Sequence, residues 1–596
     1  MNAKKLTLSG WFNLLFLILP ISLWAQTPVI LGSGNTGGMT VTTSDASGEK
    51  TVDGLGLLPN ETAASRFLGQ ATLGADFETI MATTGKSFSQ WIDEQFALPR
   101  GFSIEQQTRD ITEMVLDSSY SKGIDPNRVE PRVYYWHTAW WQYTMTQPDV
   151  LRNRVALALS EIFVISERPS LVNVPLTLAN YYDMLLDDSF GNFRKLLEDV
   201  TLHPAMGFYL THVNNPKSDS ALNRFPDENY AREVMQLFTI GLFELNNDGT
   251  EKLDSLGNPI PTYSNTEIRE FAKVFTGLTF GDAFLFGQNP QSELSYTVPM
   301  IMKDFWHEPG PKYLLNGFVV PNRNPVDGMA DINDALDNLF NHPNVGPFIA
   351  RRLIQRLVTS NPSPEYIDRV ASAFNDNGQG VRGDMKAVIK AILLDPEARD
   401  CALVNDPFSG MLREPMVRYT QLCRAFNAYS LAGTYRNDMD DLLALTLQRP
   451  LAAPHVFNFF SPDYQPIGAI ADANMHAPEF EITNAVTILG YANRLHDWIM
   501  KTNQVMEYRD FFSGETNDSD RYVNLDLTDE LALDEVVEIG DLVERLNLIL
   551  AHGQLTEATR AHITKALEQV PQNRWETRVR MAIFLVMISP DYLIIR

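Results

Sequence analysis

A helix predicted over residues 226–245 carries side chains suited to acid–base chemistry. It begins with Pro, Asp and Glu, which favour a first helical turn. At about 100° per residue, one arc of this helix gathers Glu228, Arg232, Glu233 and Gln236. Glu228 and Glu233 are the candidate catalytic acids. Arg232 and Gln236 are candidate ligand-binding groups, and the alternative is the polar face of an ordinary surface helix.

A second group of candidates is a basic stripe formed by Arg351, Arg352 and Arg356. Arg352 and Arg356 are four residues apart, so they share one face of a predicted helix and are candidate ligand-binding groups. Because the chain is acidic overall, internal Asp and Glu side chains are the expected partners. The alternative is a carboxylated or sulfated ligand, which arginine binds bidentately.

The third candidate is His307, which lies in an irregular stretch near Asp304 and Lys312. Such a histidine can act as a general base or a metal ligand. No second His stands at ligand spacing, so a hydrogen-bonded structural histidine is the favoured interpretation and no metal site is predicted.

An aromatic stretch, YYWHTAWWQY at residues 134–143, places Trp136 and Trp140 one helical turn apart. Stacked aromatic rings can bind sugars. A helix packed into the core is the more common role of such a stretch, and we expect that role here.

Helical periodicity from Leu57 onward supplies the elements that must position these groups. Residues 151–166 are apolar nearly all round, which predicts a buried central helix. Helical spacing recurs over residues 181–202, 331–395 and 541–596.

Between these helices, Asp-Gly and Gly-Asn pairs predict a small β-hairpin near residues 246–263. Stretches rich in Gly, Pro and aromatic residues predict irregular connections. We therefore expect a mainly α fold, a multi-helix assembly with a small β-hairpin insertion and long irregular connections.

Two helical regions are predicted, a main one over residues 57–400 and a C-terminal one over residues 401–596. The second contains an acid-rich stretch near residues 515–541. A solvated linker is the expected structure there, with Thr528 and the two acids after it able to cap a helix.

Two His-Pro pairs, at His203 and His342, occur in similar sequences after amphipathic helices. Proline in the first turn of the next helix needs no amide donor, and a histidine near the preceding C-terminus suits the helix dipole. Both histidines are therefore predicted to be junction residues rather than ligands.

Charge and cysteine content exclude some classes of protein. Lys and Arg number 48 against 74 Asp and Glu, a net charge of −26, so nucleic acid is not an expected partner. The 2 cysteines, Cys401 and Cys423, are expected to be separate buried thiols, with one disulfide as the alternative. No zinc, phosphate-loop or nucleophile-elbow motif is complete, so the sequence leaves the cofactor unknown.

Residues 1–25 are predicted to be a secretory signal peptide. Two lysines precede a mostly apolar stretch at residues 11–24, and Ala25 suits a cleavage site. The stretch is shorter than the roughly 20 residues of a spanning helix, which leaves an uncleaved anchor as the alternative. Residues 26–56 are rich in Gly, Ser and Thr and are predicted to be a flexible leader. We expect an exported protein, periplasmic or extracellular, without a transmembrane segment after signal cleavage.

Several long blocks of sequence occur together and in order. They are SRFLGQATLGA from Ser65, LRNRVALALSEIFVIS from Leu151, NYYDMLLDDSFGNFRKLLEDV from Asn180, PDENYAREVMQLFTIGLFELNNDGT from Pro226 and NHPNVGPFIARRLIQRLVTSNPSP from Asn341. In these blocks the chain resembles the bacterial exported family called domain of unknown function 1800, over roughly residues 60–596. The resemblance implies a mainly helical exported protein but assigns no residue a catalytic role. It also implies a candidate partner, because members are often encoded beside exported proteins related to sulfatases and alkaline phosphatases.

Two classes of function follow. Export, an acidic surface and the lack of a complete catalytic motif favour a binding or assembly factor for an envelope component or secreted partner. The alternative is a hydrolase or lyase acting on an extracellular, anionic polysaccharide, with Glu228 and Glu233 as its acid–base pair. Convergence of the candidate groups on one deep pocket would favour chemistry, and their dispersal would favour a scaffold.

Overall fold

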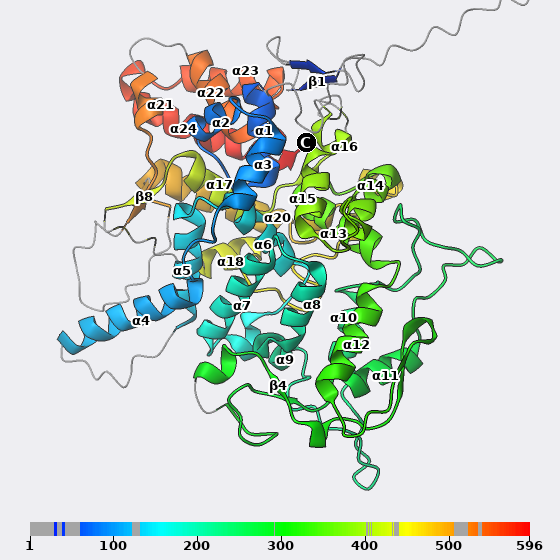
Figure 1. Cartoon of the computed structure of the whole chain (residues 1–596). Coiled ribbons are helices and arrows are strands. Elements are labelled where there is room, and N and C mark those ends of the chain that lie inside the picture. The colour runs from blue at the N-terminus through cyan, green and yellow to red at the C-terminus, as the bar shows by residue number, and fades with distance from the viewer. Residues whose placement is uncertain are drawn as a thin grey trace, which may run out of the picture.

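Helices dominate the described part of the chain (Figure 1). The computed structural model describes residues 29–31, 39–41, 60–121, 132–290, 293–400, 408–431, 440–502, 504–505, 522–533 and 539–596, with single residues at 403, 406, 433 and 435. The strands among these residues are two or three residues long and pair as separate two-stranded sheets. The predicted mainly α fold is therefore confirmed.

The predicted signal peptide, residues 1–25, lies outside the described residues. Of the predicted leader, the structure describes two short strands, β1 (Val29–Leu31) and β2 (Met39–Val41), which pair antiparallel. No helix in the described ranges combines the length and the apolar character needed to cross a bilayer.

Four helices lie in the middle of the molecule: α5 (Val133–Thr146), α6 (Val150–Ser160), α7 (Pro175–Asp188) and α8 (Phe193–Leu202). Every residue of α6 from Leu151 to Ser160 is buried, as its nearly uniform apolar character predicts. The helix ends six residues before the predicted Ser166, because Ser166 instead pairs with Ala452 in an isolated β-bridge.

The aromatic stretch forms α5, and its three tryptophans are 0% exposed, which confirms a core helix. Trp141 stacks on Tyr419, with ring centroids 4.5 Å apart. Tyr419 in turn stacks on Trp498 at 4.3 Å. This column of rings joins a central helix to segments more than 250 residues later in the chain.

The N-terminal helices are α1 (Glu61–Ala71), α2 (Phe77–Thr83), α3 (Phe88–Ala97) and α4 (Ile104–Ser121). Figure 1 shows α1 beside α22 (Ile539–Ala551), and the two helices are in contact. One hydrophobic core runs through both predicted regions, from Ala63 to Tyr592. The division between residues 400 and 401 stays a prediction.

The lower part of the molecule in Figure 1 is built on short helices and strands. They are α9 (Pro204–Tyr209), α10 (Asn229–Gln236), α11 (Asn265–Val274) and α12 (Gly328–Phe340), with β3 (Leu278–Thr279) paired to β4 (Ile301–Met302) and β5 (Lys312–Tyr313) paired to β6 (Val319–Val320).

Helix α10 is much shorter than the predicted 226–245 helix, so that prediction was wrong in extent. Gly241 adopts a left-handed φ of 71°, and its N–H donates to the Met235 carbonyl over 3.0 Å. Gly241 lies four residues beyond the C-cap, Leu237, so this bond closes the turn that follows α10 rather than capping the helix. A β-carbon at Gly241 would lie 3.1 Å from the ring of Phe348, so close packing also favours glycine there.

The predicted hairpin is present as a ribbon of isolated bridges, which pair Phe243 with Pro261, Leu245 with Glu251, and Leu253 with Pro259. Gly249 and Gly257 take left-handed φ values at its two turns. Asn247 Nδ2 donates to Asp368 Oδ1 over 2.8 Å, so the ribbon is attached to α14 (Pro364–Asn375).

The helices that follow confirm the helical pattern predicted over residues 331–395. They are α12, α13 (Val345–Leu357), α14, α15 (Met385–Leu394) and α16 (Pro396–Arg399).

His203 and His342 both lie at helix junctions, as predicted. His203 Nδ1 accepts from the Ala205 N–H over 3.1 Å, and His342 Nδ1 accepts from the Asn344 N–H over 3.2 Å. Burial lowers the pKa of His203 to about 3 and that of His342 to about 4. At neutral pH they are therefore neutral acceptors that begin the next helix, rather than cations on the preceding helix dipole.

The C-terminal region contains α17 (Pro415–Ala425), α18 (Asp440–Thr446), α19 (Ala469–Asp472), α20 (Ala485–His496), α21 (Thr528–Ala532), α22, α23 (Glu557–Glu568), α24 (Trp575–Met587) and α25 (Pro590–Leu593). Its strands are β7 (Met411–Leu412), paired with β10 (Ile594–Ile595), and β8 (Tyr429–Ser430), paired with β9 (Val523–Asn524). Cys423 in α17 is a buried free thiol, and Cys401 lies outside the described residues.

The acid-rich stretch near residues 515–541 is described only over its middle and end. Val523, Leu525 and Leu527 are buried, and α21 follows them, starting at Thr528. The described part of this stretch therefore packs against the core, although we expected a solvated linker.

Candidate functional site

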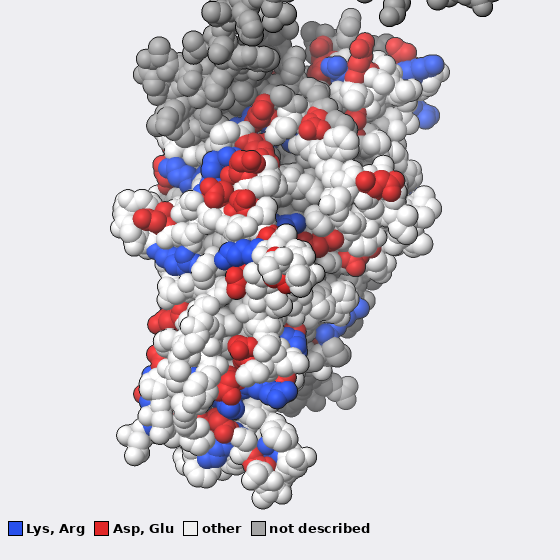
Figure 2. Space-filling model, turned by 90° about the vertical axis from the view of Figure 1, so that its right-hand side faces the viewer, with Lys and Arg blue, Asp and Glu red and all other residues white. Residues whose placement is uncertain are grey.

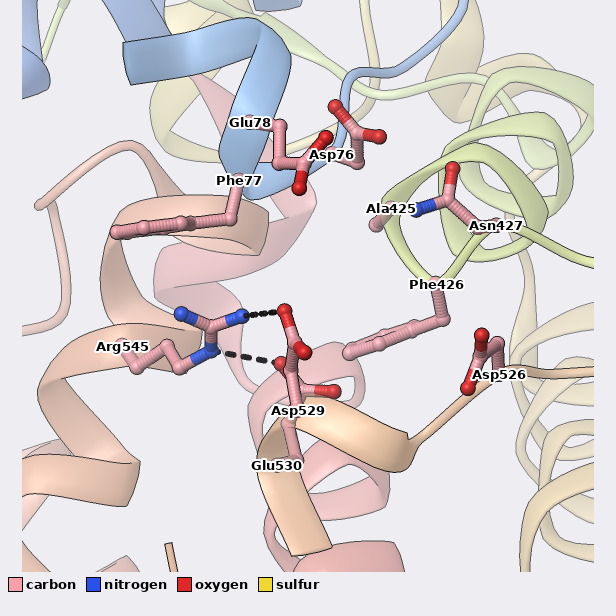
Figure 3. Close-up of a pocket in the computed structure, with 10 residues that line it drawn as sticks. All are labelled: Asp76, Phe77, Glu78, Ala425, Phe426, Asn427, Asp526, Asp529, Glu530 and Arg545. Atoms are coloured by element: carbon pink, nitrogen blue, oxygen red, sulfur yellow. Dashed lines mark hydrogen bonds and ion pairs between the residues drawn. The ribbon is translucent and has the colours of Figure 1, made fainter. Parts of the chain in front are cut away.

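A pocket of about 180 Å³ lies where the start of α2, the end of α17, the segment that leads into α21, α21 itself and α22 meet (Figure 3). Its lining is rich in carboxylates and includes two phenylalanine rings and one guanidinium. The lining residues are Asp76, Phe77, Glu78, Ala425, Phe426, Asn427, Asp526, Asp529, Glu530 and Arg545.

Local sequence places the first wall of the pocket. Asp76 is the N-cap of α2, and its Oδ1 accepts from the Thr79 N–H over 2.8 Å, as short acidic side chains do at helix starts. The helix therefore begins at Phe77, which is half-buried and packs against the core. Glu78, in the first helical turn, is exposed.

The opposite wall depends on a tight turn after α17. Asn427 takes a left-handed φ of 40°, which Asn tolerates better than most residues. The Phe426 carbonyl then accepts from the Asp526 N–H over 2.8 Å, so two segments a hundred residues apart are joined. Asp526 Oδ1 also accepts from the Thr528 N–H over 3.0 Å, at the start of α21.

Arg545 closes one side of the pocket. Its Nη2 donates to Asp529 over 3.0 Å and its Nε to Glu530 over 2.7 Å. The guanidinium carbon lies 4.2 Å from the centroid of the Phe77 ring, within the range of a cation–π contact. Glu530 is 3% exposed, so Arg545 supplies the counter-charge for an almost fully buried carboxylate.

The charge of the pocket is strongly negative. Five carboxylates line it against one guanidinium, and Arg545 is already engaged by two of them. Figure 3 shows Asp76 and Glu78, at the start of α2, on one side and the acids before and within α21 on the other, with the Phe426 ring between Asp526 and Asp529 in this view. Carboxylates beside aromatic faces can bind an ammonium or guanidinium group.

The size of the pocket limits its ligand. Small-molecule sites usually enclose about 300–1,000 Å³, so about 180 Å³ suits one side chain better than a whole drug-sized molecule. Among the described residues, no group of three or more His, Cys, Asp or Glu side chains could hold a metal ion. The carboxylates and aromatic rings of the lining suit an organic cation.

The predicted acids of α10 do not lie in this pocket. Glu228 is half-buried, with Arg232 at 3.5 Å and Arg269 at 3.8 Å from its carboxylate. Glu233 is 7% exposed, and burial raises its pKa while Arg232 opposes the shift. Gln236 is half-buried at the end of α10. One acid of the proposed pair is thus paired with two arginines and the other is almost enclosed.

His307 is 0% exposed and sits in a hydrogen-bonded network. Its Nδ1 lies 2.9 Å from the Thr276 carbonyl, and its Nε2 lies 3.0 Å from Asp331 Oδ2 and from the Lys312 ammonium. Gly328 packs so close that a β-carbon there would lie 2.9 Å from the imidazole. These contacts match the structural histidine favoured from sequence.

The arginine stripe meets internal acids, as predicted. Arg351 and Arg352 lie 3.6 Å and 3.4 Å from the carboxylate of Asp463. Arg356 is 5% exposed and lies 3.3 Å from Glu161. The α10 acids, His307 and the arginine stripe therefore have three separate sets of partners, so the structure does not bring the predicted candidates together.

Arg356 leads to a buried cluster that sequence reasoning missed. Glu161, Glu414 and Glu479 are at most 5% exposed, and Gln448 Nε2 donates to Glu414 over 2.6 Å and to Glu161 over 3.3 Å. Burial, with a further contribution from Glu414, raises the pKa of Glu161 well above its usual range. The sequence signal was a lone Glu in the apolar run LALSEIFVIS, which predicts a carboxylate inside the core.

Three pocket acids, Asp526, Asp529 and Glu530, were also missed, because the acid-rich stretch that contains them is predicted to be a linker. The sequence does contain a signal for them. The apolar residues Val523, Leu525 and Leu527 alternate with the polar residues Asn524 and Asp526. This period of two predicts a half-buried strand with its acids on the other face.

Fold and site together define a mainly helical protein with an acidic, side-chain-sized pocket. The chain belongs to the family described as Protein of unknown function (DUF1800), which it matches over residues 66–594. That span includes every residue of the pocket and confirms the resemblance drawn from the sequence blocks. No curated protein and no solved structure matches the chain.

Proposed function

We propose that this chain is an exported binding or assembly factor that binds a cationic side chain of an envelope component or secreted partner in its acidic pocket. The observation that carries the proposal is the lining: five carboxylates and two phenylalanine rings surround a volume of about 180 Å³. A Lys or Arg side chain has the size and charge that this lining favours.

The dispersal of the candidate catalytic groups supports binding over chemistry. An acid–base pair needs both carboxyl groups to face one substrate. Glu228 is half-buried and paired with Arg232 and Arg269, whereas Glu233 is almost enclosed. The hydrolase or lyase alternative gains no pocket from these residues.

Export and the partner's location rest on the N-terminal sequence, whose lysines, apolar stretch and Ala25 suit a signal peptide. A partner with a basic surface segment would be attracted by the net charge of −26. An exported protein related to sulfatases or phosphatases, encoded nearby, is the first partner to test for such a segment.

A direct test uses short peptides as probes. A tri-lysine and a tri-arginine peptide should bind the purified protein, and a tri-norleucine peptide should not, because it lacks the charge. Glu78→Gln with Asp526→Asn removes two pocket charges while keeping side-chain shape. We expect on the order of tenfold weaker peptide binding in this double variant, measured by calorimetry at low salt.

The matched control is Glu113→Gln with Asp117→Asn, which removes two exposed charges from α4 outside the pocket. It changes the net charge equally, so it separates pocket binding from general attraction. Equal weakening in both double variants, or equal binding of the norleucine peptide, would refute the proposal.

A further inference from the structure

Five apolar side chains protrude from the lower end of the molecule and form what we call the apolar tip patch. Its members and exposed fractions are Leu222 (70%), Phe225 (73%), Phe284 (85%), Leu285 (63%) and Phe305 (73%). They belong to three separate loops around β4, which Figure 1 places at the lower end of the fold. Large apolar side chains gathered at one exposed site mark an interaction surface.

The three loops share one rigid base, Trp306. Phe286 stacks on Trp306 with ring centroids 4.8 Å apart and an interplanar angle of 16°, and Phe305 meets it edge-on at 5.5 Å. The Lys217 N–H donates to the Trp306 carbonyl over 2.9 Å, which joins the third loop. The tips are therefore presented together.

Basic groups stand directly behind these tips. Lys217 Nζ lies 4.5 Å from the centroid of the Phe305 ring. Lys303 Nζ donates to the Phe284 carbonyl over 3.3 Å. Neither ammonium group forms an ion pair with an acid in the part of the chain that the structure describes, although the sequence has 74 acids against 48 bases.

Acids also lie in these loops, and hydrogen bonds within the chain hold their carboxylates in place, Asp219 and Asp227 included. Glu308 accepts from the Ser218 N–H over 2.7 Å, Asp304 from the Gly328 N–H over 2.9 Å, and Asp282 from the Ser295 hydroxyl over 2.7 Å. On the face shown in Figure 2, acidic and basic groups are interspersed, and uncharged side chains make up much of the lower end. The carboxylates keep their charge, so attraction to an anionic surface depends on the two cations that contact the tips, Lys217 and Lys303.

We infer that the apolar tip patch docks the protein onto a membrane surface that contains anionic phospholipid. Phenylalanine and leucine tips enter the interface between headgroups and acyl chains. Lys217 and Lys303, one layer behind the tips, are placed to meet lipid phosphates. The elements involved do not line the acidic pocket, so this inference goes beyond the proposed function and does not depend on it.

The test is flotation of the full chain with vesicles. Vesicles of phosphatidylethanolamine and phosphatidylglycerol should carry the protein upward, and phosphatidylcholine vesicles should carry less. Phe225→Ser, Phe284→Ser and Phe305→Ser together should weaken binding on the order of tenfold or more. Lys217→Gln with Lys303→Gln should weaken binding to anionic vesicles only, and added salt should mimic this effect.

The matched control is Leu253→Ser with Leu256→Ser, which alters two exposed leucines (56% and 83%) of the hairpin ribbon and should leave flotation unchanged. If the triple variant fails to fold, Phe225→Trp replaces it, and its emission should shift to the blue when anionic vesicles are added. Failure of the wild type to float, flotation of the folded triple variant at wild-type level, or an unshifted tryptophan emission overturns the inference. The inference is also overturned if the protein self-associates, loses this association in the patch variants and does not bind vesicles. In that case the apolar tip patch contacts a second copy of the chain and not a membrane.

Discussion

The carboxyl group of Glu479 should make the folded protein less stable as the pH rises. This side chain lies in the short helical turn Pro478–Glu481 and is 1% exposed. Neither of its oxygens has a hydrogen-bond partner among the described residues. Burial, followed by the neighbouring Glu414, raises the pKa of Glu479 to about 8, although Arg356 and Arg418 oppose the shift.

The sign and size of the effect follow from linkage. Glu479 has a pKa of about 8 when folded and about 4.5 in an unfolded chain, so the folded state keeps its proton over a range where the unfolded state loses it. Its stabilising contribution is fully present below about pH 4.5 and is lost as the pH rises through about 8. At about 1.4 kcal/mol per pH unit, the difference of 8 − 4.5 corresponds to about 5 kcal/mol.

Glu479→Gln tests this reasoning, because glutamine has the shape of the protonated acid and does not titrate. The Tm of variant and wild type should be nearly equal at about pH 5, and the variant should be increasingly more stable toward about pH 8. Differential scanning calorimetry across this range measures the difference, in which the titration of all other groups largely cancels.

Glu481→Gln is the control, because Glu481 lies in the same turn but is exposed. Its carboxylate accepts from the Ser461 N–H over 2.6 Å, a bond that an amide oxygen can also accept. This variant should follow the wild type at every pH. A Tm difference between Glu479→Gln and wild type that stays constant with pH would show that the buried carboxyl carries no extra proton.

Two further changes test the fold and the pocket wall. Gly241→Ala should lower the free energy of unfolding by about 1–3 kcal/mol, because the φ of 71° is strained for alanine and its β-carbon meets Phe348. Thermal melting measures the loss, and an unchanged Tm contradicts this argument from strain and packing. Arg545→Ala should destabilise the folded protein by about 3 kcal/mol, because it leaves Glu530, which is 3% exposed, without its counter-charge. Adding Glu530→Gln to this variant should restore stability. A double variant as unstable as Arg545→Ala alone would contradict the explanation.

Helix positions were predictable wherever the pattern of apolar residues was strong and uninterrupted. The buried helix beginning near Leu151 and the aromatic helix α5 follow from side-chain types alone, because such segments have no polar face to present to water. Their ends were less predictable. Ser166 leaves the helix to pair with Ala452, a residue whose position the local sequence does not specify.

The length of α10 is a second example of a helix end that the local sequence did not predict. The sequence from Pro226 to Leu245 has helical spacing, yet α10 ends at Gln236 and Gly241, in the turn that follows, takes a left-handed φ beside the ring of Phe348. A glycine within a helical pattern can be tolerated or can interrupt it. The left-handed φ and the contact with Phe348, a hundred residues later, prevent the helical path from continuing to Leu245.

Residue types alone determined that the chain is mainly helical, that it belongs to its family, that its tryptophan-rich helix is buried and that its arginine stripe pairs with internal acids. These properties depend on local periodicity, on motifs in order and on the cost of leaving charges unpaired in a core. Only the tertiary structure decided that Asp76, Phe426, Asp526 and Arg545 share one pocket, and that the groups on α10 do not meet His307. Such groupings depend on which distant segments pack together, and side-chain spacing along the chain contains no direct record of those distances.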